Sequence, residues 1–178
     1  MVGFVRTSSD YETIRNQAHD DARRLSIESH FADQGLIVTS INQETLDLTK
    51  GWPTFNWSSL MKRKFCTHLR RFEVSIWYES YLCGLAVGKV SKGNSWVRID
   101  NVEKMPGEGN PLKGSIFPIS FVAATKYAGL LGKQKILVTS PINQELIDYY
   151  CGFGGEYLSV KAKPYRLPFS CVLFDLTD

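Results

Sequence analysis

The sequence lacks the motifs on which several classes of protein depend. Its four cysteines are far apart and form no C-x-x-C pair, so neither a zinc knuckle nor a disulfide framework is expected. No G-x-S-x-G elbow occurs, and His19, His30 and His68 have no metal-binding spacing. We therefore expect these three histidines at the surface and no metal site.

Long apolar runs are also missing. No charged and then apolar leader precedes the first polar segment, and no run is long enough to cross a bilayer. Internal repeats and low-complexity segments are absent as well. We expect a cytoplasmic protein in a reducing setting, without membrane contact.

The composition of the 178 residues is that of a soluble globular protein, with 43% hydrophobic and 22% charged residues. This length suits one domain over residues 1–178, in which residues 1–35 form a helical N-terminal extension. A formal charge of +3 is compatible with acidic ligands but does not require nucleic acid.

Hydrophobic spacing in the first half predicts helices before strands. Residues 10–34 indicate a mostly exposed helix, and residues 36–49 indicate a strand that becomes polar toward its end. Residues 56–72 indicate an amphipathic helix with lysines and arginines around one side.

The second half alternates strands and helices. Residues 72–105 predict an antiparallel meander of three strands with a turn at residues 91–94. A glycine-containing loop then leads to a helix with Pro118 in its first turn and Gly132 at its end, followed by a buried strand over residues 133–140. Asn143 opens a further helix, and two strands end the chain. This order predicts an α/β fold with a mixed, mostly antiparallel sheet flanked by helices.

The segment 143–155 carries a motif resemblance. Asn143, Leu146, Tyr150 and Gly154 match N-x-x-A-x-x-x-Y-x-x-x-G-F except for the leucine and for Gly155 in place of the final phenylalanine. The motif and the order of elements from Leu36 onward resemble the GNAT superfamily of acetyltransferases. In residues, the resemblance covers only 135–157. It implies a GNAT-like fold with an extra N-terminal helix.

The resemblance also implies acetyl-CoA as cosubstrate, bound across the strand that ends near Met105. The usual pyrophosphate loop, Q/R-x-x-G-x-G/A, is not matched by the segment "GEGNPLKGSIF". A helix start behind a glycine loop can nevertheless bind an anion. We expect Lys113, Gly114 and Ser115 to contact the phosphates, with Asn143 as a further cofactor residue.

The activity implied by the resemblance is direct acetyl transfer to an amine on a small molecule or protein. Tyr150 would then be the general acid for the departing thiolate, because a phenol stays protonated at neutral pH. The general base is expected among strand carboxylates. Asp100 and Glu103 are at odd separation and should face opposite sides. Glu103 is our first candidate, and Glu79 is another.

A second function class stays open. The basic helix around Lys62 to Arg71 could neutralise phosphates of a nucleic acid, although such charges commonly form a solvated face. The missing pyrophosphate motif favours a catalytically inactive binding or inhibitory module, and the spacing of Asn143 and Tyr150 favours the enzyme. A homodimer is compatible with either class.

Overall fold

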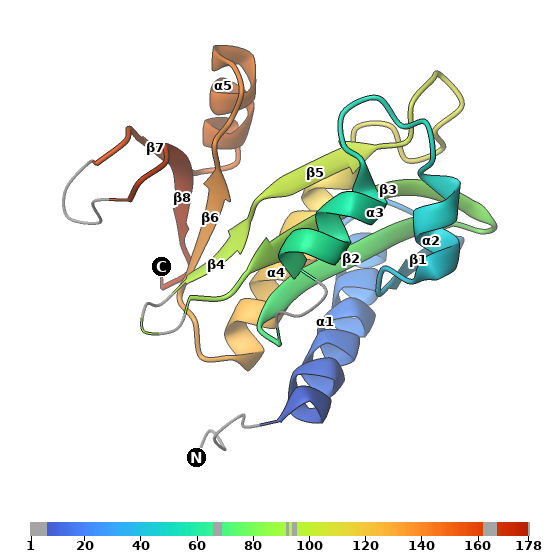
Figure 1. Cartoon of the computed structure of the whole chain (residues 1–178), viewed down its shortest axis with the longest axis horizontal. Coiled ribbons are helices and arrows are strands. Elements are labelled where there is room, and N and C mark those ends of the chain that lie inside the picture. The colour runs from blue at the N-terminus through green and yellow to red at the C-terminus, as the bar shows by residue number, and fades with distance from the viewer. Residues whose placement is uncertain (1–6, 66–68, 92, 94–95, 162–166, 178) are drawn as a thin grey trace.

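Two four-stranded sheets form the centre of the protein (Figure 1). The computed structural model describes residues 7–65, 69–91, 93, 96–161 and 167–177. The first sheet is antiparallel, in the order β1 (Leu36–Thr39), β2 (Arg71–Tyr78), β3 (Tyr81–Lys89) and β5 (Asn101–Lys104).

The second sheet is mixed. Its order is β4 (Trp96–Ile99), β6 (Lys135–Thr139), β8 (Cys171–Asp175) and β7 (Glu156–Leu158). Strands β4 and β6 are parallel, whereas β8 runs antiparallel to both β6 and β7. Only Asp100 separates β4 from β5 in the chain, so one continuous segment joins the two sheets.

Helices cover both faces of the first sheet. In Figure 1, α1 and α4 lie behind it, while α2 and α3 lie in front. The expected mixed sheet flanked by helices, with an additional N-terminal helix, is therefore confirmed. The helices are α1 (Ser8–Glu28), α2 (Gln43–Leu48), α3 (Trp57–Leu60), a π-helical turn η1 (Met61–Phe65), α4 (Ile116–Leu130) and α5 (Gln144–Gly152).

The N-terminal helix α1 is anchored by polar side chains. Arg15 forms an ion pair with Glu73 of β2 at 3.7 Å, and the Nε2 atom of His19 lies 2.8 Å from the Glu73 carbonyl oxygen. His19 is only 3% exposed, so the expectation of a surface histidine is wrong at this position. His30 is exposed as expected, and His68 lies outside the described residues.

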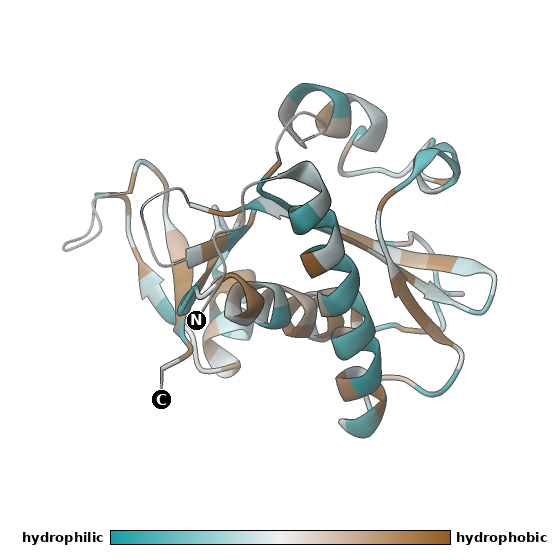
Figure 2. Cartoon of the chain, turned by 90° about the horizontal axis from the view of Figure 1, so that it is seen from below, coloured by the Kyte–Doolittle hydropathy of each residue, from teal (hydrophilic) through white to brown (hydrophobic). Residues whose placement is uncertain are grey.

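A buried stripe on α1 explains its packing beside α4. Its buried residues recur at helical spacing, and the opposite side of the helix is hydrophilic (Figure 2). The helix that was expected to be mostly exposed therefore closes the core behind the first sheet. The residues of this stripe are Tyr11, Arg15, Ala18, His19, Ala22 and Ser26.

The predicted meander is found as β2, β3 and β5, but its third strand is divided at Asp100, and the part before Asp100, β4, pairs in parallel with β6 in the second sheet. The helix predicted after the glycine-containing loop agrees with the structure. Strands β2 and β3 are joined by a tight turn in which Glu79 has a φ of 53°. Pro118 lies in the first turn of α4, and Gly132, with a φ of 66°, follows the end of that helix. The expected turn at residues 91–94 falls partly outside the described residues.

Two element predictions in the first half are wrong. Residues 36–49 form only a short strand, because the Asn42 side chain accepts a hydrogen bond from the Thr45 amide and begins α2. The helix expected over residues 56–72 ends before Arg71, where β2 begins, because Arg71 and Phe72 pair with Lys89 and Gly88 of β3.

The expected basic helix is divided accordingly. Lys62 and Arg63 are exposed on η1. Arg71 belongs to β2 and forms an ion pair with the buried Glu73 at 2.9 Å, while the Arg70 guanidinium lies 6.0 Å from the ring centre of Tyr11. These cations share no single helical face, so a nucleic-acid contact through one helix has no support here.

Among the described residues, no helix combines the length and the apolar character that a membrane crossing requires.

Candidate active site

The two sheets part where β4 continues into β5. Pairing between β4 and β6 ends at Ile99 and Val138, and β5 then pairs with β3 instead. Figure 1 shows β5 and β6 running apart beyond this point. We call the point where β5 and β6 separate the fork. At its base the Thr139 hydroxyl donates a 2.8 Å hydrogen bond to the Asp100 carboxylate and so links the two strand ends.

An irregularity at Asp100 changes which side chains face the fork. Arg98 lies opposite Leu137, whereas Asn101 and Glu103 lie opposite Val87 and Leu85. Ile99 and Val102 both pack against the main core cluster, so Arg98 and Asn101 both face the other side of the sheet although their separation is odd. The expectation that Asp100 and Glu103 face opposite sides is wrong, because the single residue between β4 and β5 shifts the alternation.

A pocket of about 440 Å³ opens on this side of the fork. We call it the fork pocket. The ends of β3, β4 and β6 and the segment before β8 supply its walls. Its lining residues are Lys89, Arg98, Asp100, Asn101, Thr139, Ser140 and Phe169.

Asp100 is the most tightly held polar group of the fork pocket. One of its carboxylate oxygens accepts the Thr139 hydroxyl, and the other accepts Nη2 of Arg98 at 2.8 Å. The Arg98 guanidinium lies 5.1 Å from the ring centre of Phe169, a separation typical of a cation–π contact. The carboxylate thus has a fixed position at the point where the strands separate.

Tyr150 lies on the other face of the sheet. It is 8% exposed and packs in the same core cluster as Ile99 and Val138, the direct chain neighbours of Asp100 and Thr139. Among the described residues, none is hydrogen-bonded to its hydroxyl. Burial raises the pKa of Tyr150 to about 12, with a smaller contribution from Tyr149. The phenol is therefore protonated at neutral pH and has its donor available.

An aromatic cluster surrounds Tyr150 between α5 and the first turn of α4. The centre of the Phe117 ring lies 4.5 Å from that of Tyr150, 5.7 Å from that of Tyr149 and 5.6 Å from that of Phe153. Tyr149 is 39% exposed, so the two adjacent tyrosines have different environments.

The loop before α4 holds the predicted phosphate contacts. Lys113 is exposed and forms an ion pair with Glu108 at 3.0 Å. Gly114 has a φ of 86°, with no atom within 4 Å of the place where a Cβ would stand. Ser115 occupies the N-cap position, but its side chain makes no capping hydrogen bond. This loop is well formed, because the buried Asn110 bonds both the Cys83 carbonyl and the Leu112 amide.

Two other predicted cofactor residues are engaged in the fold. The Met105 amide donates to the Cys83 carbonyl oxygen at 2.8 Å and so extends the sheet. The Asn143 side chain accepts a 2.8 Å hydrogen bond from the Leu146 amide and caps α5. Both residues fix the backbone around the fork, and their direct contact with a cofactor stays a prediction.

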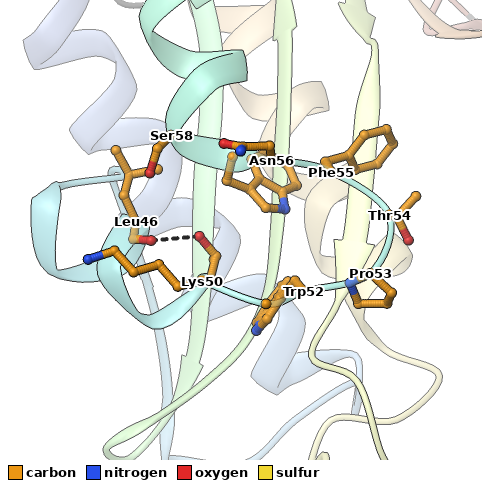
Figure 3. A pocket seen from close by; sticks show the side chains of 11 residues that line it. Leu46, Lys50, Trp52, Pro53, Thr54, Phe55, Asn56 and Ser58 are labelled. Carbon is orange, nitrogen blue, oxygen red and sulfur yellow. Dashed lines mark hydrogen bonds between the residues drawn. The ribbon is translucent and has the colours of Figure 1, made fainter.

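Glu103, the first candidate for the base, lies farther along the same face than the fork pocket. It is 6% exposed. One oxygen accepts the Thr54 amide at 2.9 Å, and the other accepts the Trp57 indole N–H at 2.6 Å. Its contacts therefore hold the loop between α2 and α3. That loop encloses a second pocket of about 410 Å³, lined by Trp52, Asn56 and their neighbours (Figure 3).

The sequence-based prediction named Asp100 only as a carboxylate on a strand and did not include Arg98, Thr139 or Phe117. A signal was present. Polar residues end two apolar strand segments, at Asp100 and at Thr139, and side chains at neighbouring strand ends can meet. Whether Asp100 and Thr139 meet depends on which strands are neighbours in the sheet, and the local spacing of residues does not encode this order.

Comparison of the sequence with protein-family models and with curated proteins finds no match. Solved structures do match. A spermidine N-acetyltransferase from Vibrio cholerae, solved as a dodecamer, aligns with a TM-score of 0.56 at 11% identity, over 82% of this chain and 96% of that chain. A Desulfovibrio desulfuricans protein assigned to the GNAT family aligns with a TM-score of 0.56 at 10% identity, over 80% and 98%.

An acetyltransferase from Streptococcus agalactiae aligns with a TM-score of 0.53 at 10% identity, over 80% of this chain and 99% of that chain. At such identity the likeness concerns the arrangement of the backbone. The motif at residues 143–155 and the order of the elements predicted the same arrangement. In this chain β5 and β6 part, and Asp100 and Tyr150 lie on opposite faces of the sheet. The arrangement of its backbone is the GNAT fold.

Proposed function

We propose that this protein is an acetyl-CoA-dependent N-acyltransferase that transfers an acetyl group directly to an amine in the fork pocket. One observation carries the proposal. The strands part beside a fixed carboxylate, Asp100, while a buried phenol with an available donor, Tyr150, lies on the other face. Two reactants approaching from the two faces would meet at the fork. The names of the structural neighbours, which are acetyltransferases, support the same reaction class.

In the proposed reaction the acceptor ammonium first gives a proton to Asp100, either directly or through water. The amine nitrogen then attacks the thioester carbonyl carbon, a C–N bond forms, and the C–S bond breaks, while the nitrogen releases its second proton to solvent and leaves a neutral amide. Asp100 returns its own proton to solvent as the products depart. The Tyr150 hydroxyl donates a hydrogen bond to the sulfur as its negative charge develops, and solvent supplies the final proton of the thiol. No covalent enzyme intermediate is needed.

The cosubstrate phosphates are assigned to the start of α4. The first amides of a helix have no intrahelical acceptor, and the positive end of the helix dipole favours an anion. Lys113 adds a charge, Gly114 leaves the backbone accessible, and the Ser115 hydroxyl is not used for capping. These properties fit a pyrophosphate even though the usual loop motif is missing.

We assign the role of base to Asp100 in place of Glu103. Both carboxylates accept two hydrogen bonds, but Asp100 lines the fork pocket, whereas Glu103 is 6% exposed and is bonded to the loop between α2 and α3. A carboxylate that holds a loop from a buried position serves structure first.

Two variants test this assignment. Asp100→Asn should lower turnover by about 10²–10⁴-fold with little change in acetyl-CoA affinity, measured by thiol release and by calorimetric titration. Glu103→Gln should instead lower the melting temperature, because its amide N–H₂ would face either the indole N–H or the Thr54 amide, at a cost of about 1–3 kcal/mol. A folded Glu103→Gln protein without turnover, beside an active Asp100→Asn protein, would restore Glu103 as the base.

A catalytically inactive binding module is the second candidate. The Phe117 ring packs against Tyr150 at 4.5 Å, and a large aromatic side chain at the first turn of α4 narrows the approach to the phenol. Calorimetric titration with acetyl-CoA separates the two candidates. Binding in the micromolar range supports the transferase, and no heat at millimolar cosubstrate supports the module.

A further inference from the structure

The described residues that line the fork pocket include two cationic side chains and one carboxylate. Three of its lining side chains are charged at neutral pH, namely Lys89, Arg98 and Asp100. The single carboxylate already accepts hydrogen bonds from Arg98 and Thr139. A ligand of this pocket therefore meets two cationic side chains and a carboxylate that is already hydrogen-bonded.

Arg98 retains donors after its contact with Asp100. A guanidinium has five N–H donors, and one hydrogen of Nη2 is donated to Asp100. The Nε atom is buried, so the donors left for a ligand are those of Nη1 and the second hydrogen of Nη2. Phe169 packs against the guanidinium, which fixes the plane in which the remaining donors lie. Planar, oriented donors of this kind match a carboxylate better than they match any neutral group.

The remaining lining groups are small and polar. Asn101, Thr139 and Ser140 offer amide and hydroxyl groups beside the charged residues. Ser140 has a φ of 50°, an uncommon conformation for a residue other than glycine, and its amide donates to the Ser170 carbonyl. The chain therefore turns directly after β6, and this hydrogen bond fixes the turn at the wall of the pocket. A volume of about 440 Å³ is of the size that takes one small molecule.

We propose that the acceptor is a small amine that also carries a carboxylate, such as a free amino acid. Its carboxylate binds Arg98 and Lys89, and its amino group lies at Asp100. This inference rests on the proposed function, because it names the substrate class of the same pocket. A polyamine, the acceptor in the name of one structural neighbour, would bring several positive charges next to the cationic side chains of Lys89 and Arg98.

The experiment compares acceptors that differ only in the carboxylate. Phenylalanine is paired with phenethylamine, and lysine with cadaverine, while phosphoethanolamine beside ethanolamine tests whether a phosphate replaces the carboxylate. Thiol release from acetyl-CoA gives kcat/KM for each acceptor, and calorimetry gives binding of the same compounds without acetyl-CoA. We expect each amino acid to exceed its decarboxylated partner by about 10-fold to 100-fold, as for a charge-assisted hydrogen bond.

Lys89→Gln provides the residue-level test. It should remove most of the preference for the amino acid, mainly through KM, whereas Lys126→Gln on α4, which does not line the fork pocket, should keep it. Arg98→Gln should remove the preference as well, with an additional loss of turnover because Asp100 loses its partner.

The outcomes separate this inference from the function on which it rests. Transfer that favours the decarboxylated amines, or spermidine, overturns the inference and leaves the transferase in place. A phosphate-bearing acceptor that exceeds the amino acids overturns the carboxylate assignment. If no amine is acetylated, the proposed function fails, and the anion site is then judged by binding alone. Phenylalanine that binds wild type and not Lys89→Gln supports the site, and equal or absent binding overturns it.

Discussion

Tyr149 and Tyr150 are adjacent in sequence but have different surroundings. Tyr150 is nearly buried in the main core cluster, whereas Tyr149 is 39% exposed and packs against Phe153. Neighbouring helix residues project about 100° apart, so the two hydroxyls cannot occupy the same place. This difference makes the pair suitable for testing the role of one phenol.

Tyr150→Phe removes the hydroxyl and keeps the ring. If Tyr150 donates to the departing sulfur, turnover should fall by about 10²–10⁴-fold while acetyl-CoA affinity barely changes. The stability should change little, because no described residue is hydrogen-bonded to that hydroxyl. Steady-state thiol release and calorimetric titration measure the two quantities. Tyr149→Phe is the control and should keep its turnover, so wild-type rates in both variants would leave the tyrosines with packing roles only.

His19 should make stability depend on pH. Burial lowers its pKa below the ordinary value of 6.5, assisted by the Arg15 charge and opposed by the bond to the Glu73 carbonyl. The unfolded chain therefore binds a proton more readily than the folded one. The contribution of His19 is complete above about pH 6.5 and is lost as the pH falls through the lower, folded-state value.

Urea denaturation of wild type and of His19→Gln at about pH 7.5 and about pH 5.5 tests this sign. The wild type should lose more unfolding free energy on acidification than the variant does. Equal losses would mean that another group controls acid stability.

Local signals predicted some elements better than others. Asn143 and Pro118 were placed correctly because capping and the missing proline N–H act within one helical turn. The prediction of one helix over residues 56–72 was wrong. Their apolar spacing fits a helix, but Arg71 and Phe72 belong to β2 and pair with β3. The shift at Asp100 could not be seen either, since it arises where one segment leaves β6 and joins β3.

Gly155 explains the departure from the motif. A side chain there would strike Val172 and would come within 2.8 Å of Phe174 on β8. The final phenylalanine of the motif therefore has no room at this position. Phe153 instead contributes an aromatic ring to the cluster around Phe117.

Gly88 shows how closely β3 approaches β4. A Cβ at this position would overlap the Arg98 carbonyl oxygen. This oxygen belongs to the backbone, so it cannot move away as the end of a flexible side chain could. Gly88→Ala should therefore destabilise the protein by about 1–3 kcal/mol, as overpacking does, and should disturb the fork pocket through Arg98. Denaturant unfolding gives the free energy. Gly129→Ala on α4, where nothing lies within 4 Å, is the matched control and should stabilise the helix by about 0.5–1 kcal/mol. Equal behaviour of the two variants would contradict the close approach.

The whole molecule shows which part of a GNAT arrangement the sequence could predict. The order of elements from Leu36 onward and the motif around Tyr150 predicted the fold, which solved structures share at only 10–11% identity. The fork pocket could not be predicted from the sequence, because its residues come from separate strands whose neighbours are set by long-range pairing. The same scaffold supports many roles, so cosubstrate binding decides between the two proposed functions.

Acetyl-CoA should raise the melting temperature, since a ligand that binds only the folded state stabilises it by about 2.7 kcal/mol at 100 times its Kd. For a domain of this size such a gain corresponds to roughly 5–10 °C. Lys113→Glu should reduce the shift strongly, because the reversed charge joins Glu108 at the predicted phosphate site. Arg24→Glu is the control. Arg24 is also exposed and also paired with a local carboxylate, but it belongs to α1. Differential scanning fluorimetry over a cosubstrate titration measures both variants. An equal shift in the two variants would contradict phosphate binding at the start of α4. No shift in wild type at millimolar acetyl-CoA would favour the inactive binding module.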